Sequence, residues 1–242
     1  MTNQIATRLL HELEELSLIK ILLFFFAASS ATFGQEFQYV SKYPEIPIVD
    51  VHYHVRDISS AANLIRVSEI VKQKYGSNIA FWIGFNDVGD NPLKIKAAVD
   101  NRILFAVATP EGEFELRPRP HYLRYLLSTY PNLYIDISSI DYLMHYPCRD
   151  NLRGFFIEYQ DRILFGLDAG TIRDIDVAPH AESYAKFFAI LETDQIIDLG
   201  YSRNMPTKGL ELPVEVLEKL YYKNALKLYP GLREALIELK LI

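Results

Sequence analysis

Two histidines at the end of an apolar run are the residues of this chain best suited to chemistry. Residues 47–54 are mostly apolar and end in His52-Tyr53-His54. Because side chains alternate between the two faces of a strand, both imidazoles point to the same side, where they can bind one divalent metal. Chance alone gives a His-x-His pair in about one such chain in ten, so the argument depends on the position at a strand end. The alternative is a pair of surface histidines near a turn.

A carboxylate closes a second apolar run. Asp168 directly follows residues 163–167. Parallel strands end at one edge of a sheet or barrel, and sites are built there, so Asp168 could complete a His, His, carboxylate metal site. A bound metal lowers the pKa of its water, which makes hydroxide available as a nucleophile, and Asp168 could take the proton. The alternative role of Asp168 is to cap the following segment.

The elements that must position these residues alternate along the chain. From about residue 40, short apolar runs alternate with longer helical segments, which is typical of parallel βαβ units. Continuous apolar runs also indicate strands that are buried on both faces. The predicted fold class is therefore α/β, with strands at 47–54, 79–85, 103–108, 133–138 and 163–167 and helices near 60–75, 120–130, 151–159, 180–192 and 213–228.

Composition excludes several classes of protein. Half of the 242 residues are hydrophobic, and 25 basic residues face 31 acidic ones for a net charge of -6, which excludes disorder. No basic run is present, so no nucleic-acid partner is expected. Cys148 is the single cysteine and cannot form an internal disulfide. Nucleotide, dinucleotide and serine-hydrolase motifs are absent.

Residues 1–34 are predicted to be a signal peptide. Lys20 precedes an apolar run at 21–28, and small residues follow at 29–31. The run is too short for a bilayer span, which needs about 20 apolar residues, so no stable membrane span is expected after processing. Acidic residues at 12–15 are unusual in a leader, and an amphipathic N-terminal helix is the alternative. Residues 35–242 would form one domain, exported to the periplasm or secreted if the leader is real and cytoplasmic otherwise.

Four segments resemble successive landmarks of the amidohydrolase-related family, the amidohydrolase 2 branch of the metal-dependent amidohydrolase superfamily, which also contains nonoxidative decarboxylases. They are residues 50–54 (DVHYH), 130–138 (YPNLYIDIS), 159–168 (YQDRILFGLD) and 220–228 (LYYKNALKL). The resemblance implies a (β/α)8 TIM barrel with one divalent metal at its C-terminal mouth, zinc by preference and manganese as the alternative. It also implies that His52 and His54 are metal ligands and that Asp168 is a ligand or a catalytic base.

The chain departs from the family in its middle. The family supplies further strands after the third, which bring another metal-binding histidine and a substrate-handling histidine. Here only residues 111–120 lie between the third strand and the next helix, which is too short for three βα units, so we expect a shortened barrel. Of the remaining histidines, His121 is the strongest substitute ligand. We expect His121, His145 and His180 to be exposed or capping residues.

Two further polar residues are expected to be structural. Asp136 alternates with apolar neighbours in the 133–138 run, where it could line the barrel or pair with a basic residue such as Arg162. Asn224 lies in the last helix, where it could brace the loop of the last strand.

The leading functional hypothesis is a metal-dependent hydrolase of the amidohydrolase-related type, acting through a metal-bound hydroxide on a small-molecule amide, ester or lactone. A nonoxidative decarboxylase on the same site is the variant of this hypothesis. The alternative is a shortened, noncatalytic relative that acts as a binding or assembly protein, with a homo-oligomer covering its strand edges. A third hypothesis is a truncated copy of a longer gene.

Overall fold

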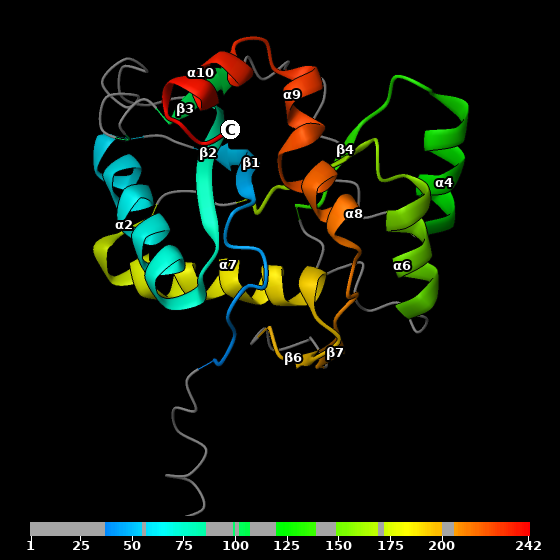
Figure 1. Cartoon of the computed structure of the whole chain (residues 1–242), viewed down its shortest axis with the longest axis horizontal. Helices are drawn as coiled ribbons and strands as arrows, with labels where there is room; N and C mark the ends of the chain where they lie inside the picture. The colour runs from blue at the N-terminus through cyan, green and yellow to red at the C-terminus, as the bar shows by residue number, and fades with distance from the viewer. Residues whose placement is uncertain are drawn as a thin grey trace, which may run out of the picture. The chain divides into compact units, whose positions relative to one another are not determined.

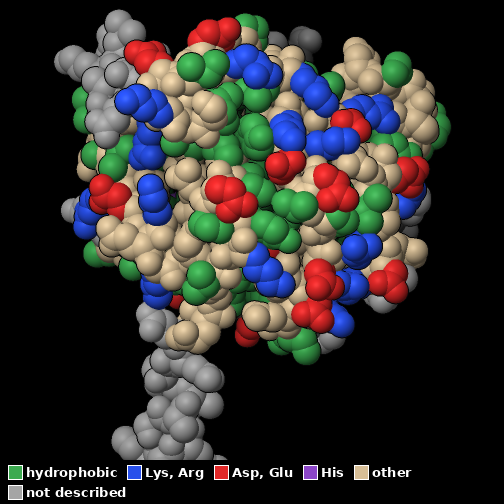
Figure 2. Space-filling model, viewed as in Figure 1, with side chains coloured by type: hydrophobic (Ala, Val, Ile, Leu, Met, Phe, Trp, Pro, Cys, Tyr) green, Lys and Arg blue, Asp and Glu red, His purple; other side chains and the backbone are tan. Residues whose placement is uncertain are grey.

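A computed structural model describes residues 37–54, 57–85, 99, 102–106, 120–138, 149–168, 172–199 and 206–242. The chain divides into two compact units, Met1–Gln38 and Tyr39–Ile242, and every element described here belongs to the second. The predicted signal peptide at 1–34 lies outside the described residues, as do His145 and Cys148. Among the described helices, none is long and apolar enough to cross a membrane. On the face drawn in Figure 2, acidic and basic side chains are interspersed.

Parallel strands dominate the described part of the second unit. β1 pairs with β2 and β2 with β3, while β4 pairs separately with β5, all in the parallel sense. The side chains of β1 are buried over most of its length, in keeping with its continuous apolar sequence. The bounds are β1 Pro47–His54, β2 Asn78–Phe85, β3 Ile103–Ala106, β4 Ile135–Asp136 and β5 Ile163–Leu164 (Figure 1).

Two backbone hydrogen bonds join β1 to the residues that follow β5. The amide of Val51 donates to the carbonyl oxygen of Phe165 at 2.9 Å, and the amide of Asp168 donates to that of His52 at 3.1 Å. Together with the strand pairs, these bonds give the lateral order β4-β5-β1-β2-β3. The last parallel strand therefore lies beside the first.

Helices connect and cover the strands. α2 begins after Asp57, whose carboxylate accepts a hydrogen bond from the amide of Ser60, and ends at Gly76 in the left-handed conformation. α2 packs against α7, which crosses close to it in Figure 1. The remaining elements are the antiparallel pair β6 (Ile196–Ile197) and β7 (Thr207–Lys208), and the helices α2 (Ile58–Tyr75), α4 (Pro120–Thr129), α6 (Arg149–Glu158), the 3₁₀ turn η1 (Asp174–Asp176), α7 (Val177–Glu192), α8 (Val214–Glu218), the π-helical turn η2 (Lys219–Lys223), α9 (Ala225–Leu228) and α10 (Leu232–Glu238).

An aromatic cluster holds the end of β5 in place. The ring of Phe165 lies 5.3 Å from that of Phe188 and 6.3 Å from that of Tyr184, both on α7. The ring of Tyr221 on η2 lies 5.7 Å from that of Phe165 and 5.9 Å from that of Phe188. All four side chains are buried, and such aromatic contacts contribute about 0.5–1.5 kcal/mol per pair beyond the area they bury. The cluster thereby anchors the segment that ends at Asp168.

The longer elements predicted from the sequence are present in the structure. The strand predicted at 47–54 is β1, and the helices predicted near 60–75 and 180–192 correspond to α2 and α7. The last helix, predicted from 213 to 228, is present as the consecutive segments α8, η2 and α9, and its middle turn, η2, is π-helical rather than α-helical. Leu220 and Tyr221 on this turn are buried. The (β/α)8 barrel stays a prediction, since residues 107–119 lie outside the described part of the chain.

Candidate metal centre

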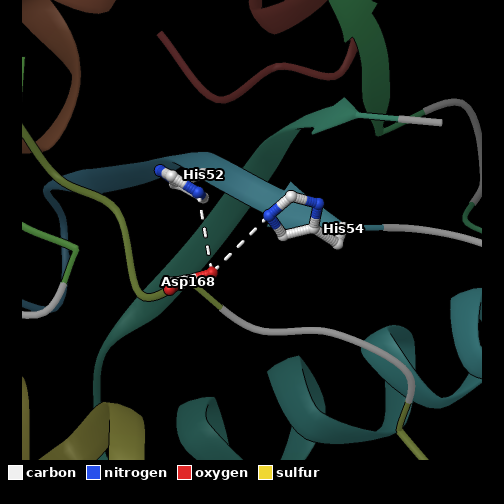
Figure 3. Close-up of side chains that lie close together, drawn as sticks. All are labelled: His52, His54 and Asp168. Carbon is white, nitrogen blue, oxygen red and sulfur yellow. Dashed lines mark ion pairs between the residues drawn. The ribbon is translucent and has the colours of Figure 1, made fainter. Parts of the chain in front are cut away.

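The three predicted metal ligands converge in space. His52 and His54 project from the same side of β1, and Asp168 reaches them from the segment after β5 (Figure 3). The Nε2 atom of His52 lies 3.6 Å from Oδ1 of Asp168, and Nε2 of His54 lies 3.6 Å from the same oxygen. The two histidine side chains are about one fifth exposed, and that of Asp168 is 44% exposed, so the cluster is open to solvent on the side of the carboxylate.

The donor set and its spacing fit a small divalent cation. The three ligand atoms all lie within 4.8 Å of one another. Zinc bonds of about 2.0–2.2 Å in a tetrahedral site place neighbouring ligand atoms about 3.4 Å apart, close to the observed separations of 3.6 Å. Two imidazoles and one carboxylate suit zinc and also manganese, and three protein ligands leave a coordination position for water or substrate.

Asp168 has an unusual backbone conformation. Its φ is +57°, in the left-handed region that non-glycine residues seldom adopt but Asp tolerates better than most. The hydrogen bond from its amide to the carbonyl of His52 helps to hold this conformation. Strained residues of this kind gather at binding and catalytic sites, where the surrounding structure maintains them. The capping alternative for Asp168 concerns residues 169–171, which lie outside the described ranges.

A second carboxylate, that of Asp136 at the end of β4, orients His52. Its Oδ2 lies 3.2 Å from Nδ1 of His52, and its Oδ1 accepts a hydrogen bond from the amide of Ser138 at 2.8 Å. Burial acts to lower the pKa of His52, but the hydrogen bond and charge of Asp136, with the charge of Asp168, outweigh it and raise that pKa to about 9. A carboxylate on the far nitrogen fixes the imidazole tautomer, which leaves Nε2 directed at Asp168.

Asp136 does pair with a basic side chain, but with His52 and not with Arg162. The Arg162 guanidinium donates instead to the backbone carbonyls of Leu127 and Tyr130, at 2.5 and 3.2 Å. Because β4 pairs with β5, and the end of β5 adjoins β1, Asp136 faces His52. Asn224 behaves as expected: its amide nitrogen donates to the carbonyl of Ile163 in β5 at 2.8 Å.

Close approach of β5 to β1 depends on Gly166. A Cβ atom at this position would lie 2.8 Å from Cβ of His52 and 3.3 Å from Oδ1 of Asp136. Both distances are shorter than ordinary van der Waals contact, and the nearer atom belongs to the root of a side chain rather than to a flexible tip. Gly166 therefore allows the two ligand-bearing segments to lie side by side.

A fully buried carboxylate that the sequence pattern does not single out, that of Asp50, lies next to the ligand-bearing backbone. Oδ1 of Asp50 accepts hydrogen bonds from the amides of His52 at 3.0 Å and Leu167 at 3.3 Å, and Oδ2 accepts one from the hydroxyl of Tyr184 at 2.5 Å. Burial raises the pKa of Asp50 to about 6, against the effect of these donors. Strand periodicity does not reveal this role, because the pairing of β1 with β2 is irregular between Asp50 and Tyr53, so Asp50 bonds to Tyr184 on α7 while His52 bonds to Asp136.

The other histidines do not join the described ligand cluster. His121 lies in the first turn of α4, but its side chain is outside the described part of the structure. The expectation that His180 is exposed or capping is wrong: its Nε2 is buried, and its ring packs edge-on against Tyr53 at 6.4 Å and Tyr184 at 5.2 Å. Burial lowers the pKa of His180 to about 4. This residue is partly buried and packs against the core residues Tyr53 and Tyr184.

Comparisons with known proteins identify no relative of this chain. No family model matches it, and neither the curated proteins nor the solved structures give a match. The resemblance to the amidohydrolase-related family therefore depends on the four sequence segments quoted above.

Proposed function

We propose that this protein is a metal-dependent hydrolase of the amidohydrolase-related type, acting on a small-molecule amide, ester or lactone, or a nonoxidative decarboxylase that uses the same site. His52, His54 and Asp168 would hold one divalent ion, zinc or manganese. The observation that carries the proposal is the convergence of two imidazole nitrogens on one carboxylate oxygen, each at 3.6 Å.

Each residue has a distinct part in this proposal. When bound, a divalent ion supplies a Lewis acid and makes a water molecule more acidic. His52 and His54 present their Nε2 atoms, and Asp136 keeps the Nδ1 proton of His52 on the side away from the ion. The solvent-facing carboxylate of Asp168 either binds the ion or accepts a proton during the reaction.

The strand order supports a relationship to a closed barrel. In a (β/α) barrel the last strand hydrogen-bonds to the first, and catalytic residues come from the C-terminal ends of several strands. The order β4-β5-β1-β2-β3 has this cyclic property, with His52 and His54 in the last residues of β1 and Asp168 in the segment after β5. We propose a barrel that is shortened between β3 and β4.

The decisive experiment is the metal content of the purified full-length chain after equilibration with zinc or manganese. We expect about one ion per chain, with the ion lost in His52→Ala and His54→Ala. His180→Ala is the matched control, because it removes a partly buried histidine outside the cluster and should keep the ion. A wild-type chain that binds neither metal would contradict the proposal.

Turnover separates the catalytic proposal from the noncatalytic alternative. The metal-loaded chain is assayed for hydrolysis of amides, esters and lactones and for decarboxylation of carboxylic acids. We expect turnover in one of these assays that disappears in His54→Ala. Stoichiometric metal without any turnover would favour the binding or assembly protein instead.

A further inference from the structure

We propose that Asp50 is a positioning residue of the metal centre, whose buried carboxylate holds the two backbone segments that carry the ligands at a fixed separation. The inference rests on the proposed metal-binding function. It adds a residue that would never touch the ion and would act through the backbone of its neighbours.

One oxygen of Asp50 is bound to both ligand-bearing segments. Its Oδ1 accepts from the amide of His52 at 3.0 Å and from the amide of Leu167 at 3.3 Å. His52 is itself a ligand, and Leu167 directly precedes Asp168. A single acceptor therefore connects the backbone at the end of β1 with the backbone beyond β5.

The hydrogen bond from the amide of Leu167 to Asp50 takes the place of a backbone hydrogen bond that a regular strand ladder would contain. A regular parallel ladder that starts with the bond from Val51 to Phe165 continues with the amide of Leu167 donating to Val51. The next observed bond instead runs from Asp168 to His52, so the β5 segment advances three residues while β1 advances one. The Leu167 amide falls inside this irregular stretch, and Asp50 satisfies it.

The other oxygen of Asp50 prevents the carboxylate from turning away. Oδ2 accepts a short hydrogen bond of 2.5 Å from the hydroxyl of Tyr184 on α7. The Tyr184 ring is itself fixed, since it packs against Phe165 at 6.3 Å and Phe188 at 5.9 Å. Asp50 and Tyr184 are both 0% exposed, so water does not compete for these contacts.

Two substitutions of Asp50 distinguish the effect of the position of its acceptor oxygen from the effect of its charge. Asp50→Asn removes the charge but keeps an acceptor oxygen at the same place, whereas Asp50→Glu keeps the charge but displaces the acceptor by one methylene group. We expect zinc affinity of the full chain within about threefold of wild type for Asp50→Asn, and about ten- to a hundredfold weaker for Asp50→Glu, the range seen when partners of metal ligands are altered. If the Glu variant fails to fold, Asp50→Ala takes its place with the same expected loss.

A second buried carboxylate provides the matched control. Glu192 is 2% exposed and accepts hydrogen bonds from the hydroxyls of Ser41 at 2.8 Å and Tyr221 at 3.0 Å, but from no ligand-bearing backbone. We expect Glu192→Gln and Glu192→Asp to keep the wild-type zinc affinity. Loss of affinity in Glu192→Asp equal to that in Asp50→Glu would overturn the inference, because general destabilisation would then account for both.

Amide hydrogen exchange of the metal-free chain distinguishes failure of this inference from failure of the proposed function. In Asp50→Glu or Asp50→Ala we expect the amides of His52 and Leu167 to exchange at least tenfold faster relative to the amides of α2. Unchanged protection of both amides, wild-type zinc affinity in these variants, or an Asn variant as weak as the Glu variant would each refute the role of Asp50. A wild-type chain that binds no zinc would refute the metal function. The exchange measurement would still test whether Asp50 holds the two backbone segments together.

Discussion

Gly166→Ala is expected to push apart the two backbone segments that carry the candidate metal ligands. The added Cβ would lie 2.8 Å from Cβ of His52, whereas ordinary carbon–carbon contact begins near 3.5 Å, so the two segments must separate by about 0.7 Å. The Cβ of His52 cannot move without its backbone, which is bound to Asp50 and Asp168. The strain therefore falls on the contact between β1 and the β5 segment.

The expected effect on metal binding is large because ligand positions tolerate little error. Metal–ligand distances in working sites lie within about 0.2 Å of their standard values. Separation by about 0.7 Å would lengthen the distance between Nε2 of His52 and Oδ1 of Asp168 from 3.6 Å to more than about 4 Å, beyond the spacing of about 3.4 Å for tetrahedral zinc ligands. We expect zinc affinity to fall at least tenfold, which is about 1.4 kcal/mol, and the free energy of unfolding to fall by about 1–3 kcal/mol.

Calorimetric zinc titration measures the affinity, and urea denaturation of the metal-free chain measures the stability. Gly154→Ala is the control, because it lies inside α6 and an added Cβ there meets no atom within 4 Å. Alanine in a helix interior is favoured over glycine by about 0.5–1 kcal/mol, so this variant should be slightly more stable and bind zinc as wild type does. Wild-type zinc affinity in Gly166→Ala, at any stability, would refute the packing argument.

Two other predictions concern buried polar groups away from the ligands. Burial raises the pKa of Glu192 from its ordinary value of 4.5, so the folded state binds this proton more tightly than the unfolded chain, and the associated stability is lost as the pH rises through the folded pKa. The free energy of unfolding of Glu192→Gln lacks this dependence on pH. Denaturation at a series of pH values should therefore show the variant gaining stability relative to wild type from about pH 4 upward. A stability difference between the two that stays constant with pH would contradict the burial argument. Asn224→Ala leaves the carbonyls of Gln160 and Ile163 without their amide donor and should cost about 1–3 kcal/mol in urea denaturation, and a cost near zero would show that other donors replace it.

The ligand cluster could be predicted from the sequence because it depends on local rules. The period of two in a strand places His52 and His54 on one side, and the structure shows both on the same side of β1. The rule that parallel strands end at one edge brings Asp168 to them, as the two distances of 3.6 Å show. The first inference needs no knowledge of which strands are neighbours, whereas the short distances to Asp168 also depend on the β5 segment lying beside β1.

The supporting carboxylates could not be predicted in the same way, because their partners depend on lateral strand order. Asp136 reaches His52 only because β4 lies beside β5 and the segment after β5 lies beside β1. The sequence alone offers Arg162 as an equally reasonable partner, and nothing in the local pattern decides between them. The connection between β3 and α4 gives no further information on strand order, because residues 107–119 lie outside the described ranges.

The ligand separation itself is set by an irregularity that no periodic pattern reveals. In a regular ladder the amide of Leu167 would donate to Val51, and the amide of Asp168 would not donate to the carbonyl of His52. Three properties of consecutive residues produce the observed geometry: Gly166 permits close approach, the Leu167 amide binds Asp50, and Asp168 adopts a left-handed backbone. The segment from Gly166 to Asp168 therefore acts as one unit, so a variant that restores a regular ladder there should lose metal affinity even though all three ligands remain.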